Sequence, residues 1–437
     1  MSNHDEMTDV VVVGGGLGGV AAAALAARAG RRVVVFEKAR VAGGRAVTQA
    51  RGEFLFNLGP HALYRSGRAM DVLRELGVEV KGGTPGASGG YAIEGGIKHT
   101  MPLGFVSLLT TDLVRLPAKL ELGRLLASFH RIDPERWLDR TVRDWLESAV
   151  RHHDVRRLLA ALVRLTTYAN APGQMSAGAA IRQLQLALAG NVAYLDGGWQ
   201  SLVDALRATA SAAGVEVVTG ARVTAVEHDG AVRGVRLADG TMRAARAVIV
   251  AASPAETREL FRPGETVLDR WADAAVPIRA ACLDVALSRL PVPTATFALG
   301  IDRPHYFSVH SAAARLAPAG AALIHLAKYL SPDSRSEPRE DERELETLLD
   351  LVQPGWRDVL VDRRFMPSLV VSNAIATAAA GGTAGRPGPA VPGIANLYVV
   401  GDWVGPEGML ADATLASARL AVRALAQDAT QQRLAAA

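Results

Sequence analysis

The sequence predicts an α/β fold in which a parallel sheet forms one domain and a mixed α+β region forms a second. Three observations support this prediction. A strand, a glycine-rich turn, a helix and a second strand follow one another over residues 9–36. Short β segments return after residue 214, and a last apolar strand precedes the final helix. The length of 437 residues exceeds that of a common single domain, so a chain with two or more domains is expected.

The first unit is a βαβ motif. The apolar run Asp9–Val13 predicts a strand, the alanine-rich stretch Leu17–Ala29 predicts a helix, and Arg32–Phe36 predicts a second strand. Because a helical crossover joins parallel strands, a parallel sheet begins here. An amphipathic helix follows at Arg68–Leu76, and the glycine-rich passage Gly82–Gly96 then breaks any regular pattern and marks a domain crossing.

The middle of the chain alternates between helical and β patterns. Residues 103–165 carry Leu, Arg and Trp at helical spacing between prolines, which predicts several short helices. A helix at Leu202–Ala213 precedes a β-meander, whose turns are indicated by two Asp-Gly pairs. The strands expected there are Val215–Val218, Arg222–His228, Ala231–Leu237 and Val248–Ala251.

The last third of the chain predicts further strands and two helices. His305–His310 and Ala321–Lys328 have strand composition, and the charged run Glu337–Leu351 predicts a helix with a solvated face. After the Gly/Pro/Ala loop Ala379–Gly393, the segment Leu397–Val400 reads as a buried strand. The last helix is expected near Leu410–Leu425.

Composition excludes several classes of protein. The net charge of +4 is too small for a nucleic-acid footprint over this length, and the one cysteine, Cys282, forms neither an internal disulfide nor a thiolate metal cage. No metal site is therefore predicted.

No apolar run approaches the length of a spanning helix, and the polar start lacks the pattern of a signal peptide. We expect a cytoplasmic protein.

The glycine-rich turn has the spacing of a dinucleotide-binding loop. Gly14, Gly16, Leu17, Gly18 and Gly19 form a GxGxxG pattern directly between a strand and a helix. In a Rossmann-like fold the first glycine allows the tight turn, the second lets the backbone approach a pyrophosphate, and the third lets the helix lie close to the strand. The helix N-terminus favours the phosphate charge.

An acidic residue ends the second strand of this unit. Glu37 is placed to accept hydrogen bonds from an adenosine ribose, and its charge disfavours a 2′-phosphate. The pattern itself leaves open whether the dinucleotide is NAD or FAD.

The whole segment Val10–Thr48 resembles the dinucleotide-binding motif of the FAD-dependent amine oxidase and phytoene desaturase-like superfamily, which includes protoporphyrinogen oxidases. Its extension Gly43-Gly44-Arg45 is distinctive of that group. The resemblance implies that the two glycines pass against the cofactor and that Arg45 lies near the diphosphate and the flavin, a role that suits a guanidinium. Lys38, beside Glu37 in the same motif, is placed among the cofactor-binding residues.

Two distant segments also resemble this superfamily. Asn396–Trp403 contains the Gly401-Asp402 pair, and the resemblance implies that Asp402 binds cofactor hydroxyls. The segment that follows, with Met409 and Leu410, is expected to begin a helix whose N-terminus faces the flavin. In the middle of the chain, the resemblance places the backbone of Val223 against the adenine.

The resemblance is confined to part of the chain and suggests the domain boundaries. A discontinuous Rossmann-like FAD-binding domain is expected in three parts and a mixed α+β substrate-binding domain in two. The FAD-binding parts are 1–80, 196–256 and 366–437, and the substrate-binding parts are 81–195 and 257–365. Because the chain lacks a C-terminal cysteine, FAD is expected to bind non-covalently.

Two residues are candidates for catalysis. His61 follows Leu58-Gly59-Pro60, where relatives approach the flavin, and could be a base or a substrate contact. Lys328 shares a strand face with Ile324 and Leu326, and a vague positional likeness places it near the flavin. A side-chain catalyst is not required, because the cofactor carries the main chemistry.

The resemblance implies an FAD-dependent oxidoreductase that carries out two-electron oxidation or desaturation of a hydrophobic organic substrate. Carotenoid-like compounds, porphyrinogens, amines and secondary metabolites remain open as substrates, and oxygen or a quinone as the electron acceptor. A redox-neutral isomerase and a non-catalytic flavin-binding protein are the alternatives. The segment Leu103–Leu116 could also make a peripheral membrane contact, although its few charges favour a substrate-domain helix packed on its own core.

Overall fold

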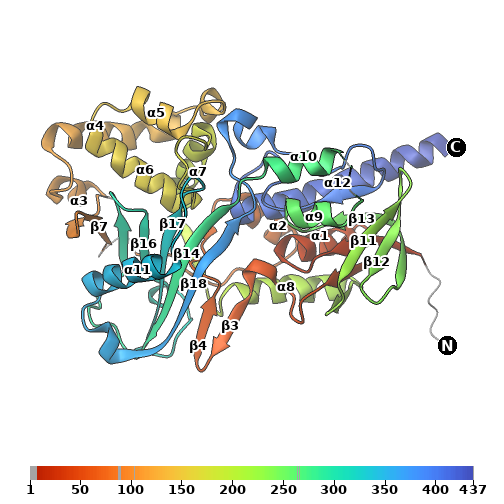
Figure 1. Cartoon of the computed structure of the whole chain (residues 1–437), viewed down its shortest axis with the longest axis horizontal. Coiled ribbons are helices and arrows are strands. Elements are labelled where there is room, and N and C mark those ends of the chain that lie inside the picture. Colours follow the sequence, from red (N-terminus) through yellow and green to blue (C-terminus); the bar gives the residue numbers. More distant parts are fainter. Residues whose placement is uncertain (1–6, 87–89, 103, 263, 265, 437) are drawn as a thin grey trace.

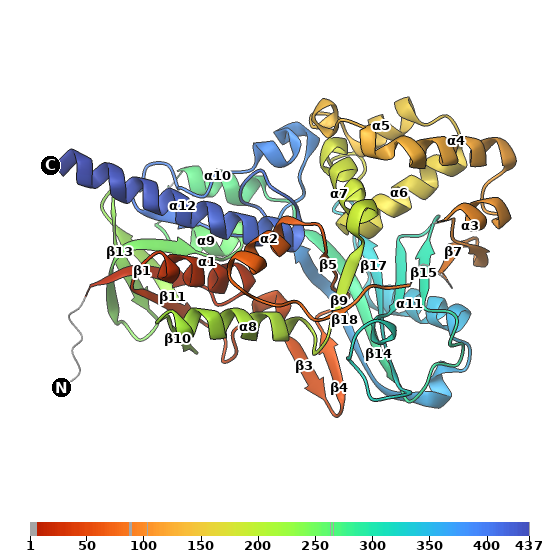
Figure 2. The ribbon, with the colours of Figure 1, turned by 180° about the vertical axis from the view of Figure 1, so that it is seen from behind.

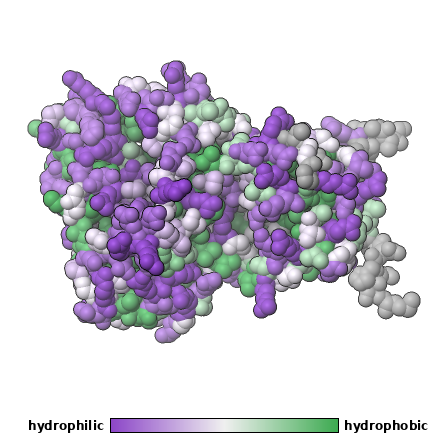
Figure 3. Space-filling view, in the orientation of Figure 1, coloured by the Kyte–Doolittle hydropathy of each residue, from purple (hydrophilic) through white to green (hydrophobic). Residues whose placement is uncertain are grey.

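The computed structural model describes residues 7–86, 90–102, 104–262, 264 and 266–436. The molecule has two lobes side by side, each built around one large sheet (Figures 1 and 2). The visible face of both lobes is mostly hydrophilic, and a narrower waist lies between them (Figure 3). The first lobe contains the βαβ unit, and the second contains the inserted segments.

The sheet of the first lobe combines a parallel part with an antiparallel part. The order is β10-β2-β1-β13-β12-β11, and a seventh strand, β19, pairs with β13. The pairs among β10, β2, β1, β13 and β19 are parallel, whereas β11, β12 and β13 form the predicted meander. These strands are β1 (Thr8–Val13), β2 (Val33–Glu37), β10 (Glu216–Thr219), β11 (Val223–His228), β12 (Val232–Leu237), β13 (Met242–Val250) and β19 (Leu397–Val399).

Helices cover both faces of this sheet, which explains why the last four residues of β1, 10–13, are all valines. Val10 and Val12 pack toward one group of helices, and Val11 and Val13 contribute to the core on the opposite face. The first group consists of α1 (Leu17–Arg28), α2 (Arg68–Glu75), α8 (Trp199–Ala212) and the long C-terminal α12 (Leu410–Ala436). The second group consists of α9 (Pro254–Glu259) and α10 (Thr266–Ala274).

The sheet of the second lobe has the order β18-β14-β17-β16-β15-β7-β8. All of its pairs are antiparallel except β15 with β7. Its strands are β7 (Gly90–Glu94), β8 (Ile97–Thr100), β14 (Ile278–Leu287), β15 (Phe297–Gly300), β16 (His305–Val309), β17 (Ala322–Leu330) and β18 (Leu360–Ser372). One face packs on α11 (Pro338–Val352).

The other face of this sheet packs on a helical layer. That layer contains four helices as predicted for residues 103–165, namely α3 (Phe105–Thr110), α4 (Leu116–Ser128), α5 (Val142–Ala149) and α6 (His153–Thr167). It also contains α7 (Ala177–Gly190), which was not predicted. Short elements lie between the lobes: the hairpin β3 (Thr48–Arg51) with β4 (Phe54–Asn57), and the small sheet β5 (Leu63–Tyr64), β9 (Val192–Leu195) and β6 (Gly82–Gly83). Single 3₁₀ turns occur at Gly44–Ala46, Phe129–Arg131, Pro134–Trp137, His310–Ala312, Trp356–Val359, Ala378–Ala380 and Gly382–Gly385.

Three details differ from the sequence-based expectations. The passage Gly82–Gly96 is not patternless, because it contains β6 and β7; residues 87–89 lie outside the described part of the chain. The boundary expected at 257 falls inside α9, and Leu260 and Leu268 pack in the core of the first lobe. The boundary expected at 365 falls inside β18, which continues the second sheet to Ser372.

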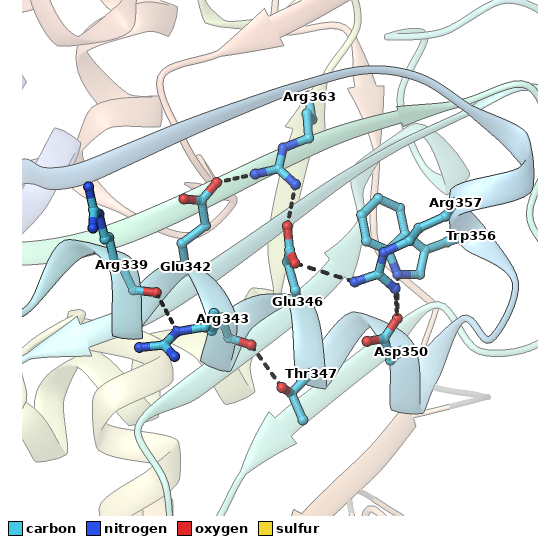
Figure 4. A network of polar contacts seen from close by, with 9 residues as sticks. All are labelled: Arg339, Glu342, Arg343, Glu346, Thr347, Asp350, Trp356, Arg357 and Arg363. Atoms are coloured by element: carbon cyan, nitrogen blue, oxygen red, sulfur yellow. Dashed lines mark hydrogen bonds and ion pairs between the residues drawn. The ribbon is translucent and has the colours of Figure 1, made fainter.

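The charged run on α11 forms the solvated face that the sequence predicts. Figure 4 shows Arg363 of β18 between Glu342 and Glu346, and Arg357 between Glu346 and Asp350. The Arg357 guanidinium also lies 4.4 Å from the ring centroid of Trp356. Because these side chains are exposed or half-exposed, each pair contributes little to stability, and the network mainly joins β18 to the helix.

Among the helices of the described residues, none combines the length and the apolar composition needed to cross a bilayer.

Candidate functional site

A cavity of about 890 Å³ runs along the carboxyl ends of the parallel strands and opens toward the second lobe. Its walls come from the glycine loop, from β2 and β11, from the segments that follow β4 and β13, and from β18 and the start of α12. Ligands of open α/β sheets bind at this edge, because loops diverge there and helix N-termini point at it.

The glycine loop lines the cavity as predicted. Gly14 has φ +105°, a conformation that side chains rarely adopt, and a Cβ on Gly19 would lie 1.9 Å from the Gly14 carbonyl oxygen. A Cβ on Gly18 would lie 2.8 Å from Thr414 Cγ2 of α12. Gly19 therefore allows α1 to approach the strand, and Gly18 allows α12 to approach α1. Gly14, Gly16, Leu17, Gly18 and Gly19 all contribute to the cavity wall.

Glu37 holds the loop through its own carboxylate. Its Oε2 accepts a hydrogen bond from the Gly15 N–H at 2.6 Å, and its Oε1 accepts one from the Ala39 N–H at 2.7 Å. The side chain is buried but borders the cavity. Each carboxylate oxygen can accept more than one hydrogen bond, so Glu37 can hold the loop and also accept hydrogen bonds from ribose hydroxyls. Lys38 lines the cavity as well, and its ammonium pairs with Glu256 at 2.6 Å.

Arg45 and Asp402 meet in the cavity wall although 357 positions separate them. The Arg45 Nη1 donates to Asp402 Oδ2 at 2.8 Å and to the Val371 carbonyl at 2.8 Å. Gly43 has φ +148° and Gly44 has φ +56°, and this turn directs Arg45 toward the cavity. The structure thus brings the predicted Gly-Gly-Arg and Gly-Asp motifs to one place.

Asp402 is buried, yet it is held as an anion. Burial alone raises the pKa of a carboxyl, but the Arg45 guanidinium and hydrogen bonds lower the pKa of Asp402 below its ordinary value. Asn373 donates to it through its backbone N–H at 3.2 Å and its side-chain amide at 2.9 Å. Gly401 is fixed in turn, because the Ser417 Oγ lies 3.1 Å from its N–H.

The remaining predicted contacts lie at the two ends of the cavity. Val223, at the start of β11, and Lys38 line one end, and Leu410, at the start of α12, lines the other. Leu410 has φ +55°, which is strained for a leucine and reverses the chain just before the helix. Met409 does not line the cavity. Its side chain is buried in the core of the second lobe, because the reversal at Leu410 turns it away.

The cavity fits the FAD that the sequence resemblance implies. An ideal Cβ on Gly16 would find no atom nearer than 3.9 Å, and one on Gly44 none nearer than 3.4 Å, so side chains there would occupy the open space. The N-terminus of α1 faces the same space with the Arg45 cation, which suits a diphosphate. Glu37 stands at the ribose position and Asp402 farther along the cavity. These residues would hold FAD along its whole length.

His61 lies at the end of the cavity nearest the second lobe. Its Nδ1 is 3.2 Å from the Gly59 carbonyl oxygen, which favours a proton on Nδ1 and leaves Nε2 as an acceptor. The ring centroid is 5.1 Å from that of Trp199. Burial lowers the pKa of His61 to about 4, so the ring is neutral near pH 7. His61 is therefore placed to contact a substrate and to accept a proton weakly.

The structure contradicts the role expected for Lys328. Its ammonium pairs with Asp341 at 2.7 Å and with Glu344 at 2.9 Å, both on α11. Lys328 does share a face with Ile324 and Leu326, but that face packs on α11 and is the one turned away from the cavity. The ion pairs of Lys328 therefore join β17 to α11.

Sequence reasoning missed three cavity residues. Tyr168 ends α6 with φ +60° and donates its hydroxyl to the Pro60 carbonyl oxygen at 3.1 Å. Trp199 is the first residue of α8, and Asn373 follows β18, for which the sequence predicts no strand. Tyr168 and Asn373 lie outside the recognisable motifs, so only the tertiary structure reveals them.

Among the residues that the structure describes, no cluster of His, Cys, Asp and Glu could hold a metal ion.

Comparison with curated protein sequences finds no match. Solved structures show the same fold. An oxidoreductase from Methanosarcina mazei has a TM-score of 0.75 at 19% identity, over 96% of this chain and 100% of that one.

Two further structures are similar. A putative protoporphyrinogen oxidase from Exiguobacterium has a TM-score of 0.69 at 18% identity. Cyclohexylamine oxidase from Brevibacterium oxydans has a TM-score of 0.70 at 17% identity. In both cases the match covers 98% of this chain and 100% of the other. The model of the flavin-containing amine oxidoreductase family matches residues 17–426. Its span takes in most of the cavity-lining motifs, and the chain belongs to this family and is an FAD-dependent oxidoreductase.

Proposed function

We propose that the protein oxidises or desaturates a hydrophobic organic substrate by two electrons. The observation that carries the proposal is the composition of the cavity end between the lobes. Apolar side chains line that end together with few polar groups. The lining residues there are Leu58, Pro60, His61, Ala62, Tyr168, Trp199, Leu369 and Leu410. A site of this kind orients an apolar substrate by shape and by a few polar contacts.

Bound FAD would supply the two-electron acceptor, and oxygen or a quinone would then receive the electrons. The chain contributes orientation and a proton acceptor. Tyr168 and Leu410 confine the substrate from opposite lobes, while the Nε2 of His61 can receive a proton from a substrate N–H or O–H. Because its pKa is about 4, His61 does not retain that proton at neutral pH and is free for the next turnover.

Non-covalent attachment of FAD is part of this proposal. The one cysteine, Cys282, is buried in β14 and does not line the cavity. Burial also raises the pKa of its thiol well above the ordinary value, which disfavours the thiolate. These facts support release of intact FAD when the protein is denatured.

The test is anaerobic reduction of the bound flavin by carotenoid-like compounds, porphyrinogens, amines and secondary metabolites, with each product identified by mass. Bleaching of the flavin with a product two hydrogens lighter supports the proposal. His61→Ala should slow reduction without loss of FAD, whereas His130→Ala, at an exposed histidine outside the cavity, should change neither. A product of unchanged mass indicates an isomerase. The absence of bleaching with every class indicates a non-catalytic flavin-binding protein.

We also propose that α3 and α4 contact an anionic lipid surface. Four large apolar side chains on these helices are more than half exposed: Val106, Leu109, Leu116 and Leu120. The side chain of Lys119 joins the two helices by donating to the Leu109 carbonyl at 2.7 Å, and Arg115 and Arg124 are exposed beside it. An apolar surface with basic residues around it suits the interface of an anionic bilayer. Leu103 lies outside the described residues.

Co-sedimentation with vesicles tests this contact. Binding to vesicles that contain phosphatidylserine is expected, with weaker binding to neutral vesicles. The double variant Leu116→Ser/Leu120→Ser should bind several-fold more weakly. Leu188→Ser is the matched control, because Leu188 is 61% exposed on α7 and lies outside this surface. Equal binding by wild type and the double variant would overturn the proposal.

A further inference from the structure

Strained backbone is confined to a few positions of the described chain. The residues other than glycine that have a positive φ there are Tyr168 at +60°, Asn191 at +56°, Asn396 at +64° and Leu410 at +55°. Asparagine tolerates this conformation, whereas in larger residues the Cβ crowds the backbone. Neither asparagine lines the cavity, but Tyr168 and Leu410 both do. The two strained conformations of large residues therefore occur at one site.

Tyr168 and Leu410 reach this site from different lobes. Tyr168 follows α6 of the second lobe, and Leu410 is the first residue of α12 of the first lobe. Both side chains are half-buried, and both pack against the same core of the second lobe. They therefore stand at the end of the cavity between the lobes, where the proposed substrate lies.

Tyr168 is held at its backbone and at its hydroxyl. Its N–H donates to the Arg164 carbonyl at 2.7 Å and ends α6, and its hydroxyl donates to the Pro60 carbonyl at 3.1 Å. The ring also meets the Tyr329 ring edge-on, with the centroids 5.8 Å apart. Glycine is the usual residue at such a helix end and adopts the conformation without strain. A tyrosine in its place indicates that the ring has a function in the cavity.

Leu410 is held by the turn that precedes α12. Gly408 has φ +70°, and a Cβ there would lie 2.7 Å from the Asp412 Cβ, so the turn is tight. The Leu410 carbonyl accepts the Thr414 hydroxyl at 2.9 Å. The turn buries Met409 and leaves Leu410 at the cavity wall. The strained backbone thus presents one aliphatic side chain to the cavity.

The carboxylates of the cavity wall are engaged elsewhere. Among the described residues that line the cavity, Glu37 accepts backbone N–H groups, Glu256 pairs with Lys38, and Asp402 pairs with Arg45. The fourth carboxylate belongs to α9 of the first lobe, at residue 259. A positive charge between the two strained side chains would lose hydration without gaining a free carboxylate. An uncharged group fits this end of the cavity better.

We propose that Tyr168 and Leu410 are the specificity-determining pair of the site. Together they set the width of the substrate end, and they select an uncharged apolar group that fits between an aromatic ring and an aliphatic side chain. The Tyr168 ring is bonded at its hydroxyl, and Leu410 follows a tight turn, so neither side chain gives way readily to a wider group. This inference rests on the proposed function, because it concerns the same substrate.

The test is calorimetric titration of FAD-loaded protein with benzyl alcohol, naphthylmethanol and anthrylmethanol, three uncharged probes of increasing ring number. Tyr168→Gly and Leu410→Gly remove each side chain where glycine is unstrained. Each variant should raise the affinity for the three-ring probe relative to the one-ring probe by about 10-fold or more. An affinity ratio equal to that of wild type in both variants overturns the proposal.

Two controls separate cavity width from general loosening. Tyr168→Phe keeps the ring and should keep the wild-type ratio. Leu420→Ala, at a half-buried position of α12 outside the cavity, should also keep it. A shifted ratio in either control contradicts the assignment of the width to these two side chains. If a glycine variant does not fold, Tyr168→Asn and Leu410→Asn replace the pair, because asparagine also tolerates a positive φ, and the same outcomes apply.

The flavin content of each variant completes the test. Loss of FAD from Leu410→Gly would assign Leu410 to the cofactor and overturn its part of the proposal. Probe binding does not depend on turnover, so the two proposals fail separately. A shifted probe ratio without oxidation of any substrate contradicts the proposed function only. Substrate oxidation with an unshifted ratio contradicts the specificity-determining pair only.

Discussion

Asp412, in the first turn of α12, should make the protein less stable as the pH rises. Its side chain is 2% exposed, and its Oδ1 accepts the Ala69 N–H at 2.7 Å at the start of α2. Its Oδ2 is buried without a hydrogen-bond partner among the described residues. Burial raises the pKa of Asp412 to about 7 from an ordinary 3.8, because one backbone N–H does not replace the lost hydration. Gly67 allows this close approach, since a Cβ there would lie 2.2 Å from Oδ1.

The sign and size of the effect follow from the two pKa values. A carboxyl whose pKa is raised by folding binds its proton more tightly in the folded state, so stability falls as the pH rises toward the folded pKa. Between pH 5 and pH 8 the unfolding free energy falls over about two pH units, from pH 5 to the folded-state pKa of about 7. At about 1.4 kcal/mol per unit, wild type should lose about 2 to 3 kcal/mol of unfolding free energy through this group.

The assay is denaturant unfolding followed by circular dichroism at pH 5 and pH 8, with saturating FAD. In Asp412→Asn the amide oxygen can still accept the Ala69 N–H, but the group no longer titrates. The free-energy difference between variant and wild type should therefore shift by about 2 to 3 kcal/mol in favour of the variant at pH 8. Asp139→Asn, at an exposed carboxyl, is the control. A difference that is the same at both pH values would falsify the reasoning.

Three further predictions concern the cofactor cavity. Glu37→Ala should raise the dissociation constant of FAD by about 10-fold to 150-fold in a flavin-fluorescence titration, because charge-assisted bonds worth about 1.5 to 3 kcal/mol are lost; an unchanged constant contradicts it. Gly18→Ala should lower the thermal midpoint by about 2 °C or more, since its Cβ meets Thr414, whereas Gly388→Ala, with open space, should not. Arg45→Met should lower the flavin-to-protein absorbance ratio of purified protein, because Asp402 loses its counter-ion; a normal ratio argues against the assigned role.

The cofactor-binding half of the fold could be predicted because its signals are local. A valine strand, a GxGxxG turn and an alanine-rich helix specify a βαβ unit within about 30 residues, and Glu37 falls at a fixed distance beyond it. The meeting of Arg45 with Asp402 is not local: the family resemblance placed both residues on the cofactor, but it predicted no contact between them. The physical reason for the contact is now visible: Asp402 needs a counter-ion where it is buried.

The second lobe was harder to predict, because alternation groups residues by face but does not say which face is functional. Lys328, Leu326 and Ile324 do lie on one face, as expected, yet it is the other face, with His325, that turns toward the cavity side. β18 is an edge strand with a proline at residue 367 and no buried residue before Ser372, so its sequence lacks a strand signal. The role of Asn373 was missed for the same reason.

The first-lobe sheet is assembled from three chain segments, residues 8–37, 216–250 and 397–399. During synthesis the glycine loop leaves the ribosome well before β19, Asp402 and the start of α12. Long-range pairing of this kind delays folding, because the distant partner must be available before the contact can form. The complete set of cofactor residues is therefore available only after Asp402 has left the ribosome. A chain that stops before Leu397 would leave β13 without its last parallel partner and would expose an open strand edge to other chains.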